Sequence, residues 1–253
     1  MIPSILPLLL STIASAEMVR ERATLVVDGV REEWSLVWKG TPVPACPPDD
    51  PISTTCPCTG FAFGESGSLD LVRRIPGRPP ETLPLDSLFD SEISPAESPG
   101  PAVLPLKPME KDDDPDDSTL PARAMTRMNV RILDFVDVDH DGRATEFLLQ
   151  VGTMPCGKRV TVAVGISRRN PHLHAFTSRH APETPLTLWW SQWERLARDA
   201  GPFETPEWIC GDHGSEEETT LALSAMNGTI SVDAKTWSCK PGAAHKLLRH
   251  EER

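Results

Sequence analysis

The spacing of hydrophobic residues along the chain predicts a structure built mainly from β-strands. In residues 159–166, Val or Ile occupies every second position, and smaller residues stand between them. A β-branched row at period two is typical of the buried face of a strand. The same kind of pattern predicts further strands at 130–135, 146–151, 173–177, 219–224 and 229–232.

Short turn motifs predict β-hairpins near both ends of the chain. Asp28-Gly29 separates apolar runs at 24–27 and 34–38, and Asn227-Gly228 separates the last two predicted strands. Asp or Asn followed by Gly accepts the positive φ angles of a tight hairpin turn. One more hairpin is expected from strands at 61–63 and 69–72.

One helix is predicted near residues 191–200. Ser191 and Glu194 form a capping-box pattern at its start, and Gly201-Pro202 marks its end. Its apolar side chains recur at helical spacing and would cover one face of a sheet. The predicted fold class is therefore mainly β, of the α+β type: an antiparallel sandwich or meander with one packed helix.

The composition changes between residues 91 and 123. Pro occurs seven times in this segment, and 111–117 is an acidic run. Such a composition buries too little apolar surface to offset the entropy of ordering, which predicts a disordered, flexible linker. The expected organisation is a signal peptide at 1–16, N-terminal β-hairpins with a Cys-rich loop at 17–90, this acidic Pro-rich linker at 91–123, and a C-terminal β-rich domain with a calcium-type loop at 124–253.

Residues 1–16 have the pattern of a secretory signal peptide. A short apolar run at 5–10 is followed by Ala14-Ser15-Ala16, which is a cleavage signature. The alternative interpretation is a buried N-terminal strand or helix. No run in the chain approaches the roughly 20 apolar residues of a membrane-spanning helix. The sequence thus predicts a secreted or periplasmic protein with no integral membrane segment after cleavage.

The cysteine content agrees with export. An even number of cysteines in an exported chain favours disulfides, with free thiols or a zinc site as alternatives. A bridge between Cys210 and Cys239 is one expected pairing. A local bridge from Cys46 to the Cys56-Pro57-Cys58 segment is another, and the remaining thiol of that segment would then pair with Cys156. The six cysteines are Cys46, Cys56, Cys58, Cys156, Cys210 and Cys239.

The charge balance argues against two classes of partner. Asp and Glu outnumber Lys and Arg by 37 to 25, which gives a formal net charge of −12. Nucleic-acid binding and polybasic membrane binding both depend on clustered cations. We therefore expect no nucleic-acid partner and instead expect a protein or a cell-envelope component.

The sharpest chemical motif begins at Asp137. Asp137, Asp139 and Asp141 occupy positions 1, 3 and 5 of a loop whose position 6 is Gly142. Carboxylates at this spacing converge on one centre when Gly permits a tight turn, and Ca²⁺ binds six to eight such oxygens. The motif therefore predicts a calcium site.

Three later residues are candidates to complete that site. The carbonyl of Arg143 would turn inward at position 7, and Thr145 or Glu146 would close the shell directly or through water. The segment resembles the DxDxDG calcium loops between β-strands of VCBS/FG-GAP proteins, and more distantly EF-hand and dockerin loops. It departs from the EF-hand at position 12, where Leu148 replaces the bidentate Glu. The alternative is a metal-free turn whose Asp side chains bond local amides.

A second group of residues suggests a different function. His172 and His174 would share one strand face, and Asp212-His213 follows Cys210-Gly211. If these residues met in one cleft, they would suit an exported hydrolase, with or without a metal. The block from Asp137 to Gly214 also resembles exported bacterial proteins of unassigned function, a resemblance that carries no activity. The favoured hypothesis is a secreted, disulfide-bonded, calcium-stabilised domain without enzymatic activity.

Overall fold

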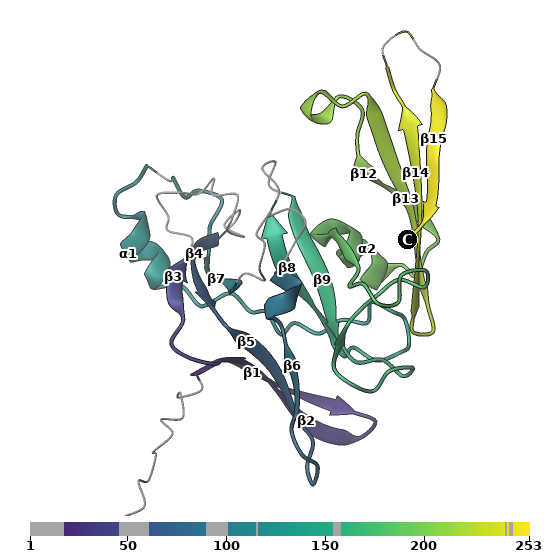
Figure 1. Cartoon of the computed structure of the whole chain (residues 1–253). Coiled ribbons are helices and arrows are strands. Elements are labelled where there is room, and N and C mark those ends of the chain that lie inside the picture. The colour runs from purple at the N-terminus through teal and green to yellow at the C-terminus, as the bar shows by residue number, and fades with distance from the viewer. Residues whose placement is uncertain are drawn as a thin grey trace, which may run out of the picture.

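The fold is formed mainly by antiparallel strands, as predicted (Figure 1). None of the helices in the described ranges is long and apolar enough to span a membrane. The predicted signal peptide and four of the cysteines, Cys46, Cys56, Cys58 and Cys156, lie outside the described residues. The computed structural model describes residues 18–45, 61–89, 101–114, 116–153, 158–240, 242 and 245–253.

The N-terminal sheet has the strand order β1-β2-β5-β6. Its first two strands form the predicted hairpin, with Asp28 and Gly29 at φ angles of 49° and 82° in the turn. The 3-10 helix η1 (Asp86–Phe89) follows the sheet. The strands are β1 (Met18–Val27), β2 (Val30–Trp38), β5 (Leu69–Arg74) and β6 (Glu81–Pro84).

A second small sheet corrects the predicted hairpin of 61–63 with 69–72. Strand β4 (Phe61–Gly67) pairs with β3 (Val43–Ala45) and β7 (Ala102–Pro108), whereas β5 pairs with β2 and β6. The two predicted strands are therefore consecutive but belong to different sheets. Fully buried Leu69 and Leu71 join the main core, which favours the pairing of β5 with β2.

Part of the predicted flexible linker is ordered. Strand β7 and helix α1 (Leu120–Met125) both lie between residues 101 and 123, while 90–100 lies outside the described residues. Ala102 and Leu104 are fully buried, so this segment does contribute apolar surface to the core. Strand β7 is an edge strand, where Pro is tolerated because the missing N–H faces away from the ladder.

The central sheet contains β8 (Glu146–Thr153) and β9 (Arg159–Gly165), with β10 (His174–Ala175) and β11 (Thr187–Trp189) paired to β9. Both faces of β8 and β9 are buried. The strand predicted at 130–135 is wrong: these residues form no strand, and only Val136 makes an isolated bridge, to Glu146.

Two apolar cores lie on opposite faces of the central sheet. Phe147 and Leu149 pack in the first core with Trp34 of β2. Leu148, which alternates with them, packs in the second core with Trp193. The first core thus joins residues before and after the predicted linker, which gives a physical reason for the order seen within 101–123.

The C-terminal sheet and one helix complete the fold. Helix α2 (Trp190–Arg198) is the predicted helix, but it starts earlier than expected: the side chain of Gln192 accepts a hydrogen bond from the Trp189 amide at 2.9 Å. The predicted bridge between Cys210 and Cys239 is confirmed. The remaining elements are β12 (Phe203–Trp208), η2 (Asp212–Gly214), β13 (Glu217–Met226), β14 (Thr229–Ser238) and β15 (Lys246–Glu252).

Candidate metal site

The acidic loop leads directly into strand β8. Backbone hydrogen bonds in both directions join Val136 and Glu146, at N–O distances of 2.7 and 3.2 Å, and close the base of the loop. Within the loop, His140 and Gly142 have positive φ angles of 52° and 88°. Gly adopts this conformation without steric cost, which explains its place at the sharpest bend. The loop therefore returns Glu146 to the residues at its own start.

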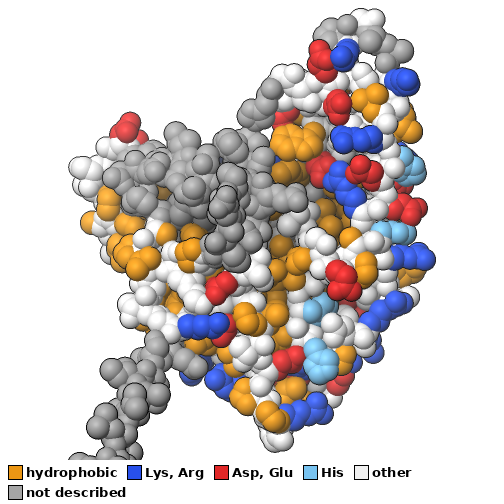
Figure 2. Space-filling model, in the orientation of Figure 1, with side chains coloured by type: hydrophobic (Ala, Val, Ile, Leu, Met, Phe, Trp, Pro, Cys, Tyr) orange, Lys and Arg blue, Asp and Glu red, His pale blue; other side chains and the backbone are white. Residues whose placement is uncertain are grey.

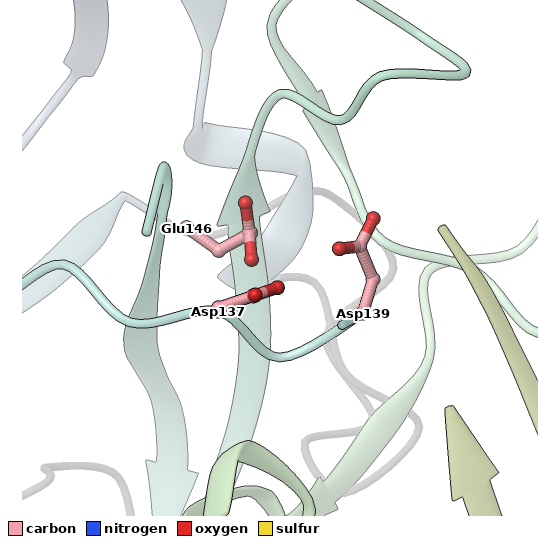
Figure 3. Close-up of side chains that lie close together, drawn as sticks. All are labelled: Asp137, Asp139 and Glu146. Carbon is pink, nitrogen blue, oxygen red and sulfur yellow. The ribbon is translucent and has the colours of Figure 1, made fainter. Parts of the chain in front are cut away.

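Three carboxylates meet inside this loop. Oxygen atoms of Asp137, Asp139 and Glu146 all lie within 4.8 Å of one another, and the three side chains face a common space (Figure 3). Asp139 and Glu146 have no solvent-exposed surface. Carboxylate oxygens are hard ligands, so a cluster of this kind could hold a metal ion.

The aspartates use most of their oxygens to order the loop. Asp137 accepts hydrogen bonds from the amides of Asp141 and Gly142 at 3.1 and 3.0 Å. Oδ1 of Asp139 accepts a hydrogen bond from the Asp141 amide at 3.1 Å. Its Oδ2 is buried and has no hydrogen-bond partner among the described residues. A buried, unpartnered carboxylate oxygen is costly and points to a missing ligand.

Glu146 reaches the cluster from strand β8. Its Oε2 accepts a hydrogen bond from the amide of Val138 at 2.9 Å, and its Oε1 lies 2.7 Å from the hydroxyl of Thr145. That hydroxyl also lies 2.9 Å from the carbonyl oxygen of Ile166. Because a hydroxyl has one proton, it can donate to only one of these acceptors at a time. The hydroxyl of Thr145 therefore lies between the carboxyl group of Glu146 and the backbone just after β9.

Burial and mutual repulsion raise the pKa values of two carboxyl groups. Burial, followed by the charge of Asp141, raises the pKa of Asp139 to about 7. Burial is also the main cause that raises the pKa of Glu146 to about 9, with a further contribution from the charge of Asp139. The cluster without a cation thus favours protonated carboxyl groups, and a bound cation would reverse that preference.

The carboxylate of Asp141, a predicted ligand, is directed elsewhere. Asp141 accepts hydrogen bonds from the amides of Arg143 and Arg168, so its carboxylate joins the loop to the segment after β9. The predicted ligand of Arg143 is its backbone carbonyl, and its guanidinium forms an ion pair with Asp28 in the turn between β1 and β2. The structure thus brings together Asp137, Asp139 and Glu146 of the six predicted residues, and gives the side chains of Asp141, Arg143 and Thr145 other partners.

Neighbouring elements hold the loop in place through contacts that the sequence did not reveal. Nε2 of His140 lies 2.7 Å from the carbonyl oxygen of Leu196, in helix α2. The amide of Gly228, in the turn between β13 and β14, donates to the carbonyl oxygen of Asp139 at 3.0 Å. Both partners are more than fifty residues away from the loop in sequence. Only the tertiary fold could identify them.

The residues of the alternative hydrolase site are dispersed. His172 lies against Glu81, and Nδ1 of His174 lies 2.8 Å from the carbonyl oxygen of His172. Asp212 pairs with Lys158, which lines a different cavity from the one lined by His174. The side chain of His213 lies outside the described part of the structure. The described geometry therefore offers no shared cleft for this group.

The comparisons with known proteins give no match. No known protein family, no curated protein and no solved structure resembles the chain at a significant level.

Proposed function

We propose that this protein is a secreted or periplasmic, disulfide-bonded domain that is stabilised by Ca²⁺ and binds a protein or a cell-envelope component without enzymatic activity. The observation that carries the metal part of this proposal is the buried, unpartnered Oδ2 of Asp139, a side chain that meets Asp137 and Glu146 in one acidic cluster. A cation at this point would supply the missing partner and neutralise three clustered carboxylates.

The donor set favours Ca²⁺ over other common metals. The three converging side chains offer only carboxylate oxygens, whereas zinc sites generally include His or Cys ligands. Mg²⁺ demands a near-ideal octahedral shell of short bonds, while Ca²⁺ accepts irregular shells and bidentate carboxylates. Asp137, Asp139 and Glu146 would hold the ion, and backbone carbonyls or water would complete its shell.

Two features support the proposed location. The signal-peptide pattern at 1–16 predicts export, and the bridge between Cys210 and Cys239 suits an oxidising compartment. Millimolar Ca²⁺ is available to extracellular modules, which fits a site with few carboxylates. Export is tested by the intact mass of the protein recovered outside the cytoplasm, which should begin at Glu17. Recovery of the full-length chain from the cytoplasm would contradict it.

Metal selectivity tests the proposed site itself. The purified protein is dialysed against equal concentrations of Ca²⁺, Mg²⁺ and Zn²⁺, and bound metal is measured by mass spectrometry. We expect about one Ca²⁺ bound per molecule of wild-type protein, and we expect Asp139→Asn to lose this ion. Asp134→Asn, which alters an exposed carboxylate just before the loop, is the matched control and should retain the ion. Equal Ca²⁺ in both variants, or preferential Zn²⁺ binding, would contradict the assignment.

A further inference from the structure

A cleft lined by aromatic and basic side chains is formed by residues other than those of the acidic loop. It has a volume of about 380 Å³, which falls within the usual range for small-molecule sites. The start of β9, the junction of β11 with α2, and strand β12 form its walls. It shares no lining residue with the cluster of Asp137, Asp139 and Glu146.

Tryptophan side chains give the cleft an apolar wall. Trp189 and Trp190 line it, and the ring of Trp208 meets that of Trp189 edge-on with centroids 6.0 Å apart. All three rings are only partly buried. Partly exposed indoles in a concave site provide flat surfaces for the apolar face of a ligand.

Two cations are held over these rings. The ammonium of Lys158 lies 4.6 Å from the ring centroid of Trp208 and also pairs with Asp212. The guanidinium of Arg159 lies 4.3 Å from the ring centroid of Trp190. This guanidinium is half-buried and makes no hydrogen bond or ion pair with the described residues, although the carboxylate of Glu194 attracts it electrostatically. A guanidinium in this state can still offer its N–H groups to a carboxylate in a bidentate manner.

Lys158 and Arg159 place two adjacent cations along one wall of the cleft, next to the start of β9. On the face drawn in Figure 2, Lys and Arg side chains are interspersed with Asp and Glu. In a chain of net charge −12, adjacent cations in a cleft make a local site for an anion. The same net charge disfavours a long polyphosphate, which would meet repulsion outside the cleft.

Polar groups beside the rings suit a ligand rich in hydroxyl groups. Ser191 and Thr205 contribute hydroxyls to the lining, and Glu207 contributes a carboxylate that also pairs with Arg253 at 2.9 Å. Hydroxyls can donate to or accept from a ligand, whereas a carboxylate accepts only. The disulfide at Cys210 directly follows the lining residue Ile209 and fixes this end of β12.

From this geometry we propose that the cleft binds an acidic saccharide, a sugar ring that carries a carboxylate. The apolar C–H face of the ring packs against the indoles, its carboxylate pairs with Arg159, and its hydroxyls bond to Ser191, Thr205 and Glu207. The proposal specifies the ligand class for the binding role proposed above, and it rests on that role but not on the calcium site.

Titration calorimetry with defined oligosaccharides tests this proposal. The probes are a galacturonic acid trisaccharide, a neutral glucose trisaccharide of equal length and a nucleoside monophosphate, each added to the full protein with its disulfide intact. We expect saturable binding of the galacturonic acid trisaccharide alone. Arg159→Gln should weaken that binding by about tenfold or more, because a charge-assisted bidentate contact is lost. Arg198→Gln, at the other end of α2, is the matched control and should leave binding unchanged.

Several outcomes would overturn the proposal. They are equal binding of the neutral sugar, tighter binding of the nucleotide, no binding of the acidic sugar at millimolar concentration, and equal affinity in wild type and Arg159→Gln. Circular dichroism of each variant verifies that it is folded. Arg159→Lys keeps the charge but loses the forked guanidinium, so its affinity for the acidic sugar should lie between those of wild type and Arg159→Gln. The titrations are performed both in EDTA and in Ca²⁺. If the sugar binds but Ca²⁺ neither binds to nor stabilises the protein, only the proposed metal site is refuted.

Discussion

The backbone amide of Gly228 donates a hydrogen bond to the backbone carbonyl oxygen of Asp139, at 3.0 Å. This contact joins the tight turn between β13 and β14 to the most deeply buried aspartate of the acidic loop. A Cβ atom at residue 228 would lie 3.4 Å from Oδ2 of Asp139 and 3.2 Å from Cγ of Arg169. The hairpin turn and the candidate metal site are therefore in direct contact.

We expect Gly228→Ala to destabilise the protein and to weaken Ca²⁺ binding. Gly228 has a φ angle of 78°, and Ala at such an angle costs about 1 kcal/mol, to which the contacts with the loop add. Gly29→Ala is the matched control, because Gly29 has a φ angle of 82° in an equivalent turn but no atom within 4 Å of the added Cβ. Thermal unfolding with and without Ca²⁺ measures both effects. The same loss of Ca²⁺ response in the two variants would refute the link between turn and site.

The pH dependence of stability follows from the two raised pKa values. Asp139 and Glu146 titrate at about 7 and about 9 in the folded protein, above their ordinary values of 3.8 and 4.5. The folded state then binds more protons than the unfolded state, so stability falls as the pH rises between those values. In EDTA, we expect the melting temperature to decrease from about pH 5 to about pH 9.

Glu146→Gln should flatten this pH profile, because a neutral amide can keep the contacts with Val138 and Thr145 without titrating. At alkaline pH in EDTA the variant should be more stable than wild type, yet it should respond less to Ca²⁺. Melting curves over the pH series test both statements. A variant profile parallel to that of wild type would show that Glu146 does not cause the decrease.

Removal of the disulfide should destabilise the C-terminal sheet. The bridge joins residues separated by 29 positions, and closure of a loop of that size contributes roughly 2–4 kcal/mol. The double variant Cys210→Ser with Cys239→Ser should therefore melt at a lower temperature than wild type under oxidising conditions. In the presence of reductant, which opens the bridge in wild type as well, the two proteins should have similar melting temperatures. A melting temperature equal to wild type in oxidising buffer would contradict the estimate.

Asp139 and Asp141 should respond differently to substitution. The carboxylate of Asp141 accepts two backbone amides, so Asp141→Ala should lower stability even in EDTA. Asp139→Asn removes one of three clustered charges, so in EDTA at alkaline pH it should be at least as stable as wild type. Denaturant unfolding in EDTA separates the two. Equal destabilisation would mean that both aspartates serve only to order the loop.

Local sequence patterns predicted the local parts of this fold correctly. Asp28-Gly29 forms the expected turn because its conformational preference is a property of adjacent residues. The placement of β4 and β5 in different sheets could not be predicted in the same way, since Leu69 and Leu71 of β5 are positioned by a core that includes residues distant in sequence. Similarly, Pro105 suggested disorder, but the burial of Leu104 and the edge position of β7 accommodate it.

The candidate site was predictable only in outline. The spacing of Asp137 and Asp139 identified two members of the cluster, and Glu146 was a candidate to close it. The orientation of Asp141 depends on the amide of Arg168, which the fold brings to the loop from beyond β9. The cleft around Arg159 gave no sequence signal, because its walls meet only in the folded chain: β9 pairs with β11, and Trp189 of β11 donates a hydrogen bond to the carbonyl oxygen of Glu207 in β12.

The most direct test of the central claim is the effect of Ca²⁺ on thermal unfolding and on the heat of binding of wild-type protein and Asp139→Asn. For an extracellular module we expect a dissociation constant on the order of 10⁻⁴–10⁻³ M, so saturating Ca²⁺ should stabilise wild type by about 1–3 kcal/mol. Mg²⁺ should have a smaller effect, and Asp139→Asn should show none. Identical wild-type melting curves in EDTA and in Ca²⁺, with no heat of binding, would mean that the loop is a turn and not a metal site.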